Sequence, residues 1–205
     1  MSRPPSFLDD PTDTREAIML ATYQALRKHG YANLTIQHIG DEFEKSKSLL
    51  YHHYDGKDQL LLDFLEFMLE QFEDRIPFPG VQTERAYLEA ILDRVLVTPL
   101  PDDQRDFQRA MVELRAQAAH DEAYRDYFTR SDQFFRKQLA HVIRAGIERD
   151  VFEPMDPSQT AATLQAIVVG AMTQRVTSED DLTEAVRAEV DRYLSAFVYD
   201  QREHT

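Results

Sequence analysis

Apolar residues recur at every third or fourth position along most of the chain, which is the spacing of amphipathic helices. The β-branched residues follow the same spacing, and the Asn-Gly pair typical of a β-hairpin is absent. The pattern therefore predicts an all-α protein of about nine helices without internal repeats. The expected helices cover about residues 14–29, 36–43, 47–54, 57–75, 82–97, 102–119, 121–149, 157–175 and 182–203.

Polar residues at the expected helix starts support these boundaries. Asp13 is followed three positions later by a glutamate, as in a capping box, and Thr35 is placed to cap the next helix. Asp156 precedes a proline and, three positions on, a glutamine, which predicts another capped start. Gly30 is expected to end the first helix. Residues 1–12 are proline-rich and irregular, so we expect a flexible tail there.

Composition adds a strong charge asymmetry. The chain holds 37 acidic and 23 basic residues, and its formal net charge is -14. Residues 1–60 contribute −2 of this charge and residues 61–205 contribute −12; only five of the basic residues are lysines. Abundant carboxylates with scarce lysine fit a protein that works in molar salt, where self-repulsion is screened, and favour a halophilic archaeal source. An ordinary acidic mesophilic protein is the alternative.

Cysteine is absent, which excludes disulfides, thiolate metal sites and a cysteine nucleophile. The first residues lack the apolar run of a signal peptide, and the longest apolar run, at 166–172, is far too short to span a bilayer. We therefore expect a cytoplasmic protein that does not interact with membranes.

Residues 45–60, KSKSLLYHHYDGKDQL, gather three of the five lysines and two adjacent histidines in an otherwise acidic chain. The short expected helices 36–43 and 47–54 are separated by only three residues, which predicts a helix-turn-helix. In a DNA major groove, lysine can bond guanine, histidine and serine can donate or accept, and leucine can contact a thymine methyl group. The alternative is that the tyrosines pack internally and the lysines are simply solvated.

Residues 35–60 read TIQHIGDEFEKSKSLLYHHYDGKDQL. Without a gap, this segment resembles the pattern of TetR-family transcriptional regulators, roughly T-v-x-x-I-A-x-x-x-G-v-s-x-g-x-l-Y-x-h-F-x-s-K-x-x-L. The resemblance extends over residues 14–61, and a weaker one follows in AGIERDVFEPMDPSQTAATLQAIVVGAM at 145–172. The residues on the pattern are Thr35, Ile39, Ser46, Leu50, Tyr51, His53, Lys57 and Leu60, with Tyr54 replacing the usual Phe.

The resemblance implies a DNA-binding domain at 13–56, followed by a ligand-binding and dimerisation domain at 57–205. It places the base-reading positions on Lys47, Ser48, Leu49 and His52. It places the phosphate contacts on Thr35, Gln37, Tyr51, His53 and Lys57. Ile39, Leu50 and Tyr54 would form the core of the DNA-binding domain.

Three positions depart from the family pattern. The glycine of the turn is Glu44 here, and the apolar residue after it is Lys45. Glycine permits a positive φ that costs another residue about 1 kcal/mol, so either Glu44 bears that strain or the turn takes another shape. The family's small alanine is Gly40, which weakens helix propensity but allows close approach of two helices.

The family also implies a homodimer that reads a pseudo-palindromic operator in double-stranded DNA and responds to a small-molecule effector. Helices 157–175 and 182–203 are the expected dimer pair, although an intrachain core fits their apolar stripes equally. The expected dimer contacts are Leu164, Val168, Ala171, Met172, Val190, Tyr193, Leu194 and Phe197. The expected effector pocket, whose members are also compatible with ordinary core, contains Phe64, Met68, Tyr87, Phe107, Met111, Arg115, Phe128 and Phe135.

Two other classes of function compete with a regulator. An enzyme is disfavoured because His52 and His53 are adjacent, so one helix face cannot offer both rings to a metal, and the common catalytic motifs are absent. We therefore expect no catalysis, metal or cofactor. The second alternative is a helical ligand-binding or adaptor protein with weakened DNA binding, which Glu44, Lys45 and the net acidity favour. The sequence best fits a DNA-binding repressor whose operator affinity is changed by an effector.

Overall fold

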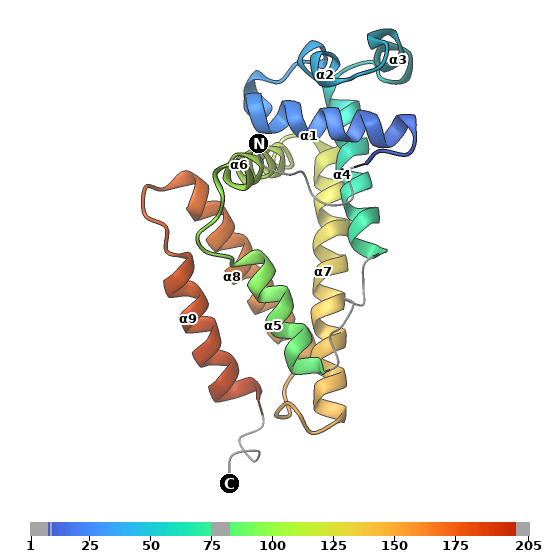
Figure 1. Ribbon diagram of the computed structural model, residues 1–205. Helices are drawn as coiled ribbons and strands as arrows, with labels where there is room; N and C mark the ends of the chain where they lie inside the picture. The colour runs from blue at the N-terminus through green and yellow to red at the C-terminus, as the bar shows by residue number, and fades with distance from the viewer. Residues whose placement is uncertain (1–7, 9, 75–82, 200–205) are drawn as a thin grey trace. The chain divides into compact units, whose positions relative to one another are not determined.

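The computed structural model describes residues 8, 10–74 and 83–199 of the chain. These residues form nine α-helices and a short π-helix, and no strand occurs among them (Figure 1). The all-α prediction is therefore confirmed. The helices are α1 (Thr14–Asn33), α2 (Ile36–Glu42), α3 (Lys47–His53), α4 (Lys57–Glu73), α5 (Glu84–Val95), α6 (Asp102–Gln117), α7 (Glu122–Glu148), α8 (Pro157–Thr177), α9 (Thr183–Tyr193) and η1 (Leu194–Val198).

The expected helix starts at three polar residues are confirmed. The carboxylate of Asp13 accepts the backbone N–H three residues later at 2.8 Å, and the hydroxyl of Thr35 does the same at 3.1 Å. Asp156 accepts the N–H groups two and three residues later. Each bond satisfies a donor that the first turn of a helix leaves unpaired, so these side chains fix where three helices begin.

The helices group into two compact units. The first contains residues up to 76 together with 101–129, and the second contains residues 77–100 and 130–205. Helix α7 therefore contributes its first turns to one unit and its remaining turns to the other. These compact units are not divided between residues 56 and 57, because α4 and α6 contact α1. The boundary between the expected DNA-binding and ligand-binding domains stays a prediction.

Helix α1 is the centre of the first unit. It contacts α2, α4 and α6, and its Met19, Ala25 and Leu26 are completely buried. The ring of Tyr23 lies 4.8 Å from the ring of Phe107 on α6. Leu8 is also completely buried, which does not fit a flexible tail at that position; residues 1–7 and 9 lie outside the described residues.

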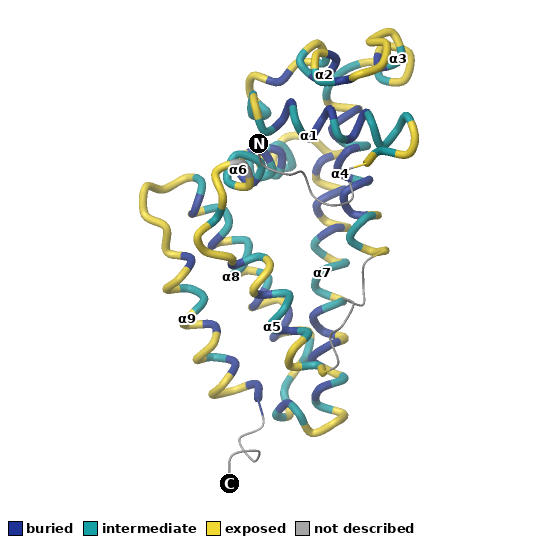
Figure 2. Tube along the Cα trace, in the orientation of Figure 1, coloured by how far each residue is buried: buried dark blue, intermediate teal, exposed yellow. Residues whose placement is uncertain are grey.

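The second unit has a core formed by one face each of α5, α7, α8 and α9. Figure 2 shows buried and exposed positions alternating along α9, as expected for a helix with one packed face. Gly146 of α7 lies directly under the ring of Phe152, which a Cβ at that position would strike. The buried Arg175 of α8 donates to the hydroxyl of Thr183 at 2.8 Å and to the carbonyl of Val97 at 2.9 Å. It thereby joins α8 to the start of α9 and the end of α5.

The last helix is shorter than expected. Helix α9 ends at Tyr193, the wider turn of η1 follows, and Tyr199 forms an isolated antiparallel bridge with Phe152. The rings of Tyr199 and Phe152 lie 5.5 Å apart, and the Tyr199 hydroxyl donates to Glu89 at 3.2 Å. These contacts hold residue 199 away from a helical path, and the expected helical residues 200–203 lie outside the described residues.

Candidate nucleic-acid interface

No residue in the turn between α2 and α3 has a left-handed backbone conformation. Helix α2 ends at Glu42 and α3 begins at Lys47. Among the described residues other than glycine, only Asp150 has a positive φ. Glu44 therefore does not carry the backbone strain that a glycine would relieve. Of the two possibilities that the sequence left open, the turn takes another shape.

Gly40 of α2 faces α3, at a distance where a Cβ would make ordinary van der Waals contacts. A Cβ at position 40 would lie 3.4 Å from Cγ and Cδ of Lys47 and 3.6 Å from a terminal methyl group of Leu50. Ile39 and Leu50 are completely buried, as expected for the core of a DNA-binding domain. The short helix α3 is therefore fixed on α2 by one apolar anchor and by the stem of a lysine.

Tyr54, at the end of α3, adds a polar contact to this frame. It is half-buried rather than fully buried, and its hydroxyl donates to Asp63 of α4 at 2.5 Å. Burial and the bond to Asp63 raise the pKa of Tyr54, so the hydroxyl remains protonated and can donate. Asp63 also accepts a bond from Arg15 of α1 at 2.7 Å. Sequence reasoning missed Asp63, because its position on α4 gives no sign that two other helices reach it.

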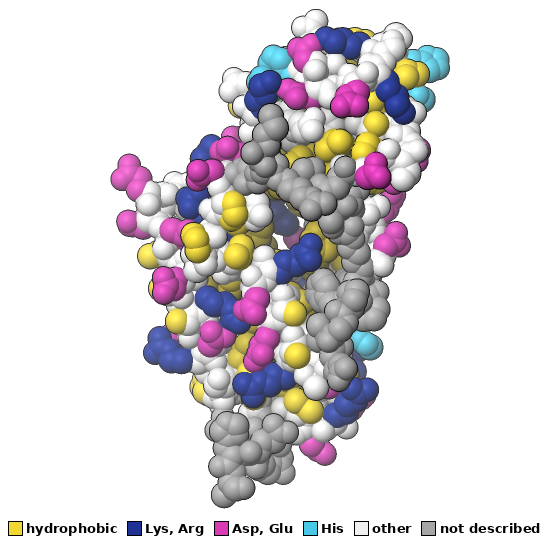
Figure 3. All heavy atoms as spheres, in the orientation of Figure 1, with side chains coloured by type: hydrophobic (Ala, Val, Ile, Leu, Met, Phe, Trp, Pro, Cys, Tyr) yellow, Lys and Arg dark blue, Asp and Glu magenta, His cyan; other side chains and the backbone are white. Residues whose placement is uncertain are grey.

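Seven of the nine expected DNA contacts are exposed, and the other two, Leu49 and Lys57, are half-buried. Helices α2 and α3, which carry most of them, contact each other. Figure 3 shows basic (lysine or arginine) and histidine side chains around α2 and α3, interspersed with acidic ones. Tyr51 itself is 53% exposed, so its side chain is accessible to a ligand. The exposed residues are Thr35, Gln37, Lys47, Ser48, Tyr51, His52 and His53.

Two of the expected lysine contacts already have partners within the chain. Lys47 forms an ion pair with Asp41 of α2, and Lys57 donates to the backbone carbonyl of Tyr31 at 3.2 Å. The hydrogen bond to Lys47 and its charge lower the pKa of Asp41, so this carboxylate remains ionised. Asp41 was missed from the sequence, where it stands six positions before Lys47, on the other side of the turn. Its contact with Lys47 makes it part of the candidate interface.

Histidine rings meet at two places in the first unit. His29 at the end of α1 stacks on His38 of α2, with ring centroids 4.0 Å apart and an angle of 10° between the planes. His52 and His53 on α3 meet edge to face at 5.5 Å. The first pair joins two helices, whereas both rings of the second pair are exposed on α3.

The expected effector-pocket residues are divided between the two units. Phe64, Met68, Phe107, Met111, Arg115 and Phe128 lie in the first unit, and Tyr87 and Phe135 lie in the second. The rings of Phe64 and Phe107 lie 6.2 Å apart, and the Arg115 guanidinium lies 4.6 Å from the centre of the Phe128 ring. Tyr87 packs against the core of the second unit. These contacts are those of packed core, and the pocket stays a prediction.

Gln108 of α6 is a polar residue that sequence reasoning did not select. Its side chain is buried, with 7% exposure, and its Oε1 has no hydrogen-bond partner within the described residues. An unpaired buried acceptor costs about 1–3 kcal/mol, so it is a site where a ligand atom could supply the missing donor. It follows Phe107, one of the expected pocket residues, in the sequence of α6.

Four of the eight expected dimer contacts are buried within the chain. Leu164, Ala171, Val190 and Leu194 lie in the core of the second unit, where α8 packs against α5 and α9. Their side chains pack within the chain, and the dimer contact stays a prediction. Phe197 is 66% exposed, and Val168, Met172 and Tyr193 are half-buried. These four remain candidates for a dimer contact.

Within the described residues, no group of three or more histidine, aspartate or glutamate side chains could hold a metal ion. The same part of the chain contains no helix with the length and apolarity needed to cross a membrane.

A short helix held by a turn on a frame of two other helices, with lysine, histidine and tyrosine on its exposed face, defines a helix-turn-helix DNA-binding protein. Comparison with known families assigns this class more closely. The model for bacterial regulatory proteins of the tetR family matches residues 18–64, and the model for the C-terminal part of BetI-type transcriptional repressors matches residues 84–198. The chain belongs to the TetR family and is a DNA-binding transcriptional regulator.

Individual relatives agree with this assignment. A solved TetR regulator from Haloarcula marismortui is 39% identical, with 90% of this chain and 97% of that chain covered and a TM-score of 0.80. The transcriptional repressor AcnR of Corynebacterium glutamicum is 23% identical over 86% of this chain and 93% of its own. A regulator from Saccharomonospora viridis, solved in complex with choline, is 20% identical, covers 91% of this chain and 98% of its own, and has a TM-score of 0.78.

Proposed function

We propose that this protein is a cytoplasmic repressor, not an enzyme, and that α3 reads its operator. The observation that carries the proposal is the exposed face of α3, where Lys47, His52 and Tyr51 are held on a frame anchored by the completely buried Ile39 and Leu50. Lysine and histidine can bond guanine and adenine edges, and the tyrosine hydroxyl can meet a phosphate. The second candidate, a helical adaptor with weakened DNA binding, is favoured by the acidic residues among these side chains.

Selection of bound duplexes from a random DNA pool tests the proposal directly. The purified protein would be used both in dilute KCl and in near-molar KCl. We expect a pseudo-palindrome whose half-sites lie about one and a half to two helical turns apart. If the folded protein enriches no sequence at either salt concentration, with or without candidate effectors, the adaptor is the better explanation.

Substitutions on α3 separate reading of bases from general charge attraction. Lys47→Ala and His52→Ala should each weaken binding to the selected operator about tenfold or more, because each removes a contact to a base. Lys137→Ala is the matched control, since Lys137 is the exposed lysine of α7. The same loss in the Lys137 variant would mean that only net charge matters.

We also propose that the effector is a small organic cation. Residues 61–205 carry a net charge of −12, which attracts cations. The choline complex of the Saccharomonospora viridis regulator makes choline the first compound to test. We expect choline to raise the melting temperature and to weaken operator binding. Its uncharged analogue 3,3-dimethylbutanol should do neither, and equal responses would contradict a cationic effector.

The proposed homodimer uses the exposed faces of α8 and α9. Gly170 of α8 is exposed, and nothing lies within 4 Å of the position of a Cβ there. Phe197 and Leu182 are large apolar residues with 66% and 45% exposure, which a partner would cover. Gly170→Arg should therefore leave the fold intact and convert a dimer to a monomer in light scattering. Ala123→Arg, on the exposed face of α7, is the control that should remain dimeric.

A further inference from the structure

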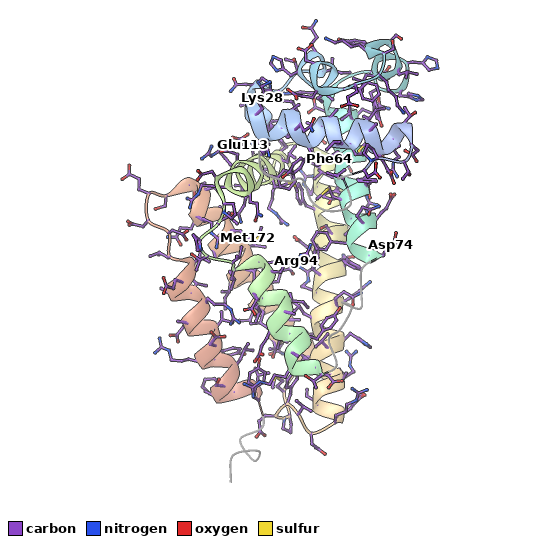
Figure 4. The ribbon with its side chains drawn as sticks, viewed as in Figure 1. Lys28, Phe64, Asp74, Arg94, Glu113 and Met172 are labelled. Atoms are coloured by element: carbon purple, nitrogen blue, oxygen red, sulfur yellow. The ribbon has the colours of Figure 1, made fainter. Side chains whose placement is uncertain are left out.

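The backbone N–H and the backbone carbonyl of Tyr31, at the end of α1, each form a hydrogen bond with a residue of another helix. Gly30 interrupts the helical backbone with a φ of 66°. The N–H of Tyr31 then donates to Glu113 Oε2 of α6 at 2.7 Å, and its carbonyl accepts from Lys57 Nζ of α4 at 3.2 Å. Lys57 Nζ also lies 4.4 Å from the centre of the Tyr31 ring. Figure 4 shows Glu113 on α6 beside the part of α1 that carries Lys28.

The hydroxyl of Tyr31 makes a second set of contacts. It donates to Asp58 Oδ1 at 3.3 Å, and the hydroxyl of Tyr124 on α7 donates to the same oxygen at 3.2 Å. Burial and the charge of Asp58 raise the pKa of both phenols, so both remain protonated donors. Tyr31, Lys57, Asp58, Glu113 and Tyr124, here called the Tyr31 junction, therefore connect α1, α4, α6 and α7.

The position of Lys57 depends on this junction. Lysine is a flexible side chain with three donors, and the Tyr31 carbonyl uses one of them, so the others can bond a phosphate oxygen. Lys57 is also the first residue of α4, whose free backbone amides favour the same anion. Contacts that hold Nζ in place before DNA arrives reduce the conformational entropy that binding must remove.

Glu113 and Tyr124 lie outside the segment 13–56 that the sequence assigns to DNA binding. We propose that they are positioning residues, which hold Lys57 for an operator phosphate through Tyr31 and Asp58 and so let α6 and α7 set operator affinity. This inference rests on the proposed function, because it requires that Lys57 meets DNA. It adds two residues, on helices remote in sequence, to those that determine binding.

A double-mutant cycle tests whether Glu113 acts through Lys57. Operator affinity would be measured by fluorescence anisotropy, at one KCl concentration, for the wild type, Glu113→Ala, Lys57→Met and the double variant. Glu113→Ala should weaken binding about 3- to 10-fold in the wild type and should have no effect in the Lys57→Met background. Glu113→Gln should restore part of the affinity, because its amide oxygen can still accept from the Tyr31 N–H.

Two further variants serve as controls, one for the loss of charge and one for the loss of folding stability. Glu122→Ala removes the same charge from an exposed position of α7, and it should leave binding unchanged or slightly stronger. Tyr124→Phe removes only a hydroxyl group. It should weaken operator binding when Lys57 is present and have no effect in the Lys57→Met background. This second cycle tests the inference even if Glu113→Ala proves unstable in thermal unfolding. Equal losses with and without Lys57 would overturn the inference while leaving the repressor function intact. A wild type that selects no operator would overturn both.

Discussion

At position 30, backbone conformation decides which residue is tolerated. Gly30 has a φ of 66°, and a Cβ there would lie 3.3 Å from Glu113 Oε2. Gly30→Ala should therefore lower the free energy of unfolding by about 1–2 kcal/mol, as measured by urea denaturation. Gly56→Ala is the control, because Gly56 has an extended backbone with nothing near its Cβ position. An unchanged stability for Gly30→Ala would mean that the end of α1 adjusts freely.

Replacing Gln108 should raise the free energy of unfolding, which is the opposite of the effect expected at Gly30. Its Oε1 is buried without a partner among the described residues, so Gln108→Leu, which keeps a similar volume, removes an unfavourable group. We expect the melting temperature without ligand to rise by about 2–4 °C for each kcal/mol gained. If an effector uses this oxygen, the same variant should also lose its response to choline.

The matched control is Gln104→Leu on the exposed part of the same helix, which should change neither property. A melting temperature that falls in the Gln108 variant would show that the amide is already satisfied in solution.

Local sequence rules predicted single residues well where neighbours in the chain decide the structure. Thr35 caps its helix, because capping acts within one turn. Gly30 was expected to end the first helix; it leaves the helical conformation, but α1 continues past it to Asn33. Asp41 and Asp63 could not be predicted in the same way. Their partners are defined by how helices pack, and a carboxylate on an exposed helix face carries no sign of which cation or hydroxyl will reach it.

At the scale of elements, the contact between α1 and α2 should depend on pH. Burial, His38 and the nearby Lys28 lower the pKa of His29 below 6.5, and the carboxylates of Glu42 and Asp41 oppose this only in part. The unfolded chain therefore binds a proton more readily than the folded chain, so stability should fall as the pH drops from about 6.5 through the folded pKa. His29→Asn should flatten this part of the profile in urea unfolding between pH 5 and 8.

His141→Asn, an exposed histidine of α7, should leave the pH profile unchanged. An NMR titration of the His29 ring gives the direct measurement, and a midpoint at or above 6.5 would contradict the stacked arrangement.

Helix starts were predicted closely from capping residues, but two features at the element scale were not. The last helix was expected to continue to residue 203, because its apolar spacing continues past the point where Tyr199 turns to meet Phe152. The compact units also divide the chain within α7, since a helix of 27 residues offers different faces to different neighbours along its length. Spacing identifies a helix and its apolar face, whereas only the packed structure identifies which helix covers that face.

For the whole molecule, a net charge of -14 predicts that salt stabilises the fold. The distance over which charges act falls from about 10 Å at 0.1 M salt to about 3 Å at 1 M, so repulsion among the carboxylates should be largely screened by then. We expect the melting temperature to rise steeply with KCl up to about 1 M and less beyond it. Sucrose at equal osmolality controls for exclusion of cosolutes, and a flat KCl profile would favour an ordinary mesophilic protein.

The ion pair between Lys47 and Asp41 has a consequence for how the regulator would behave in a living cell. When a lysine leaves a carboxylate to meet DNA, the phosphates lose a bound cation, but the abandoned carboxylate attracts one in return. The net number of ions released on binding then falls by roughly one for each such lysine. Operator affinity therefore depends less steeply on the salt concentration. In a cell whose potassium concentration rises and falls with the salinity outside, the fraction of operators that the regulator occupies would then change less. Transcription would then depend more on the effector concentration than on the salt concentration outside the cell.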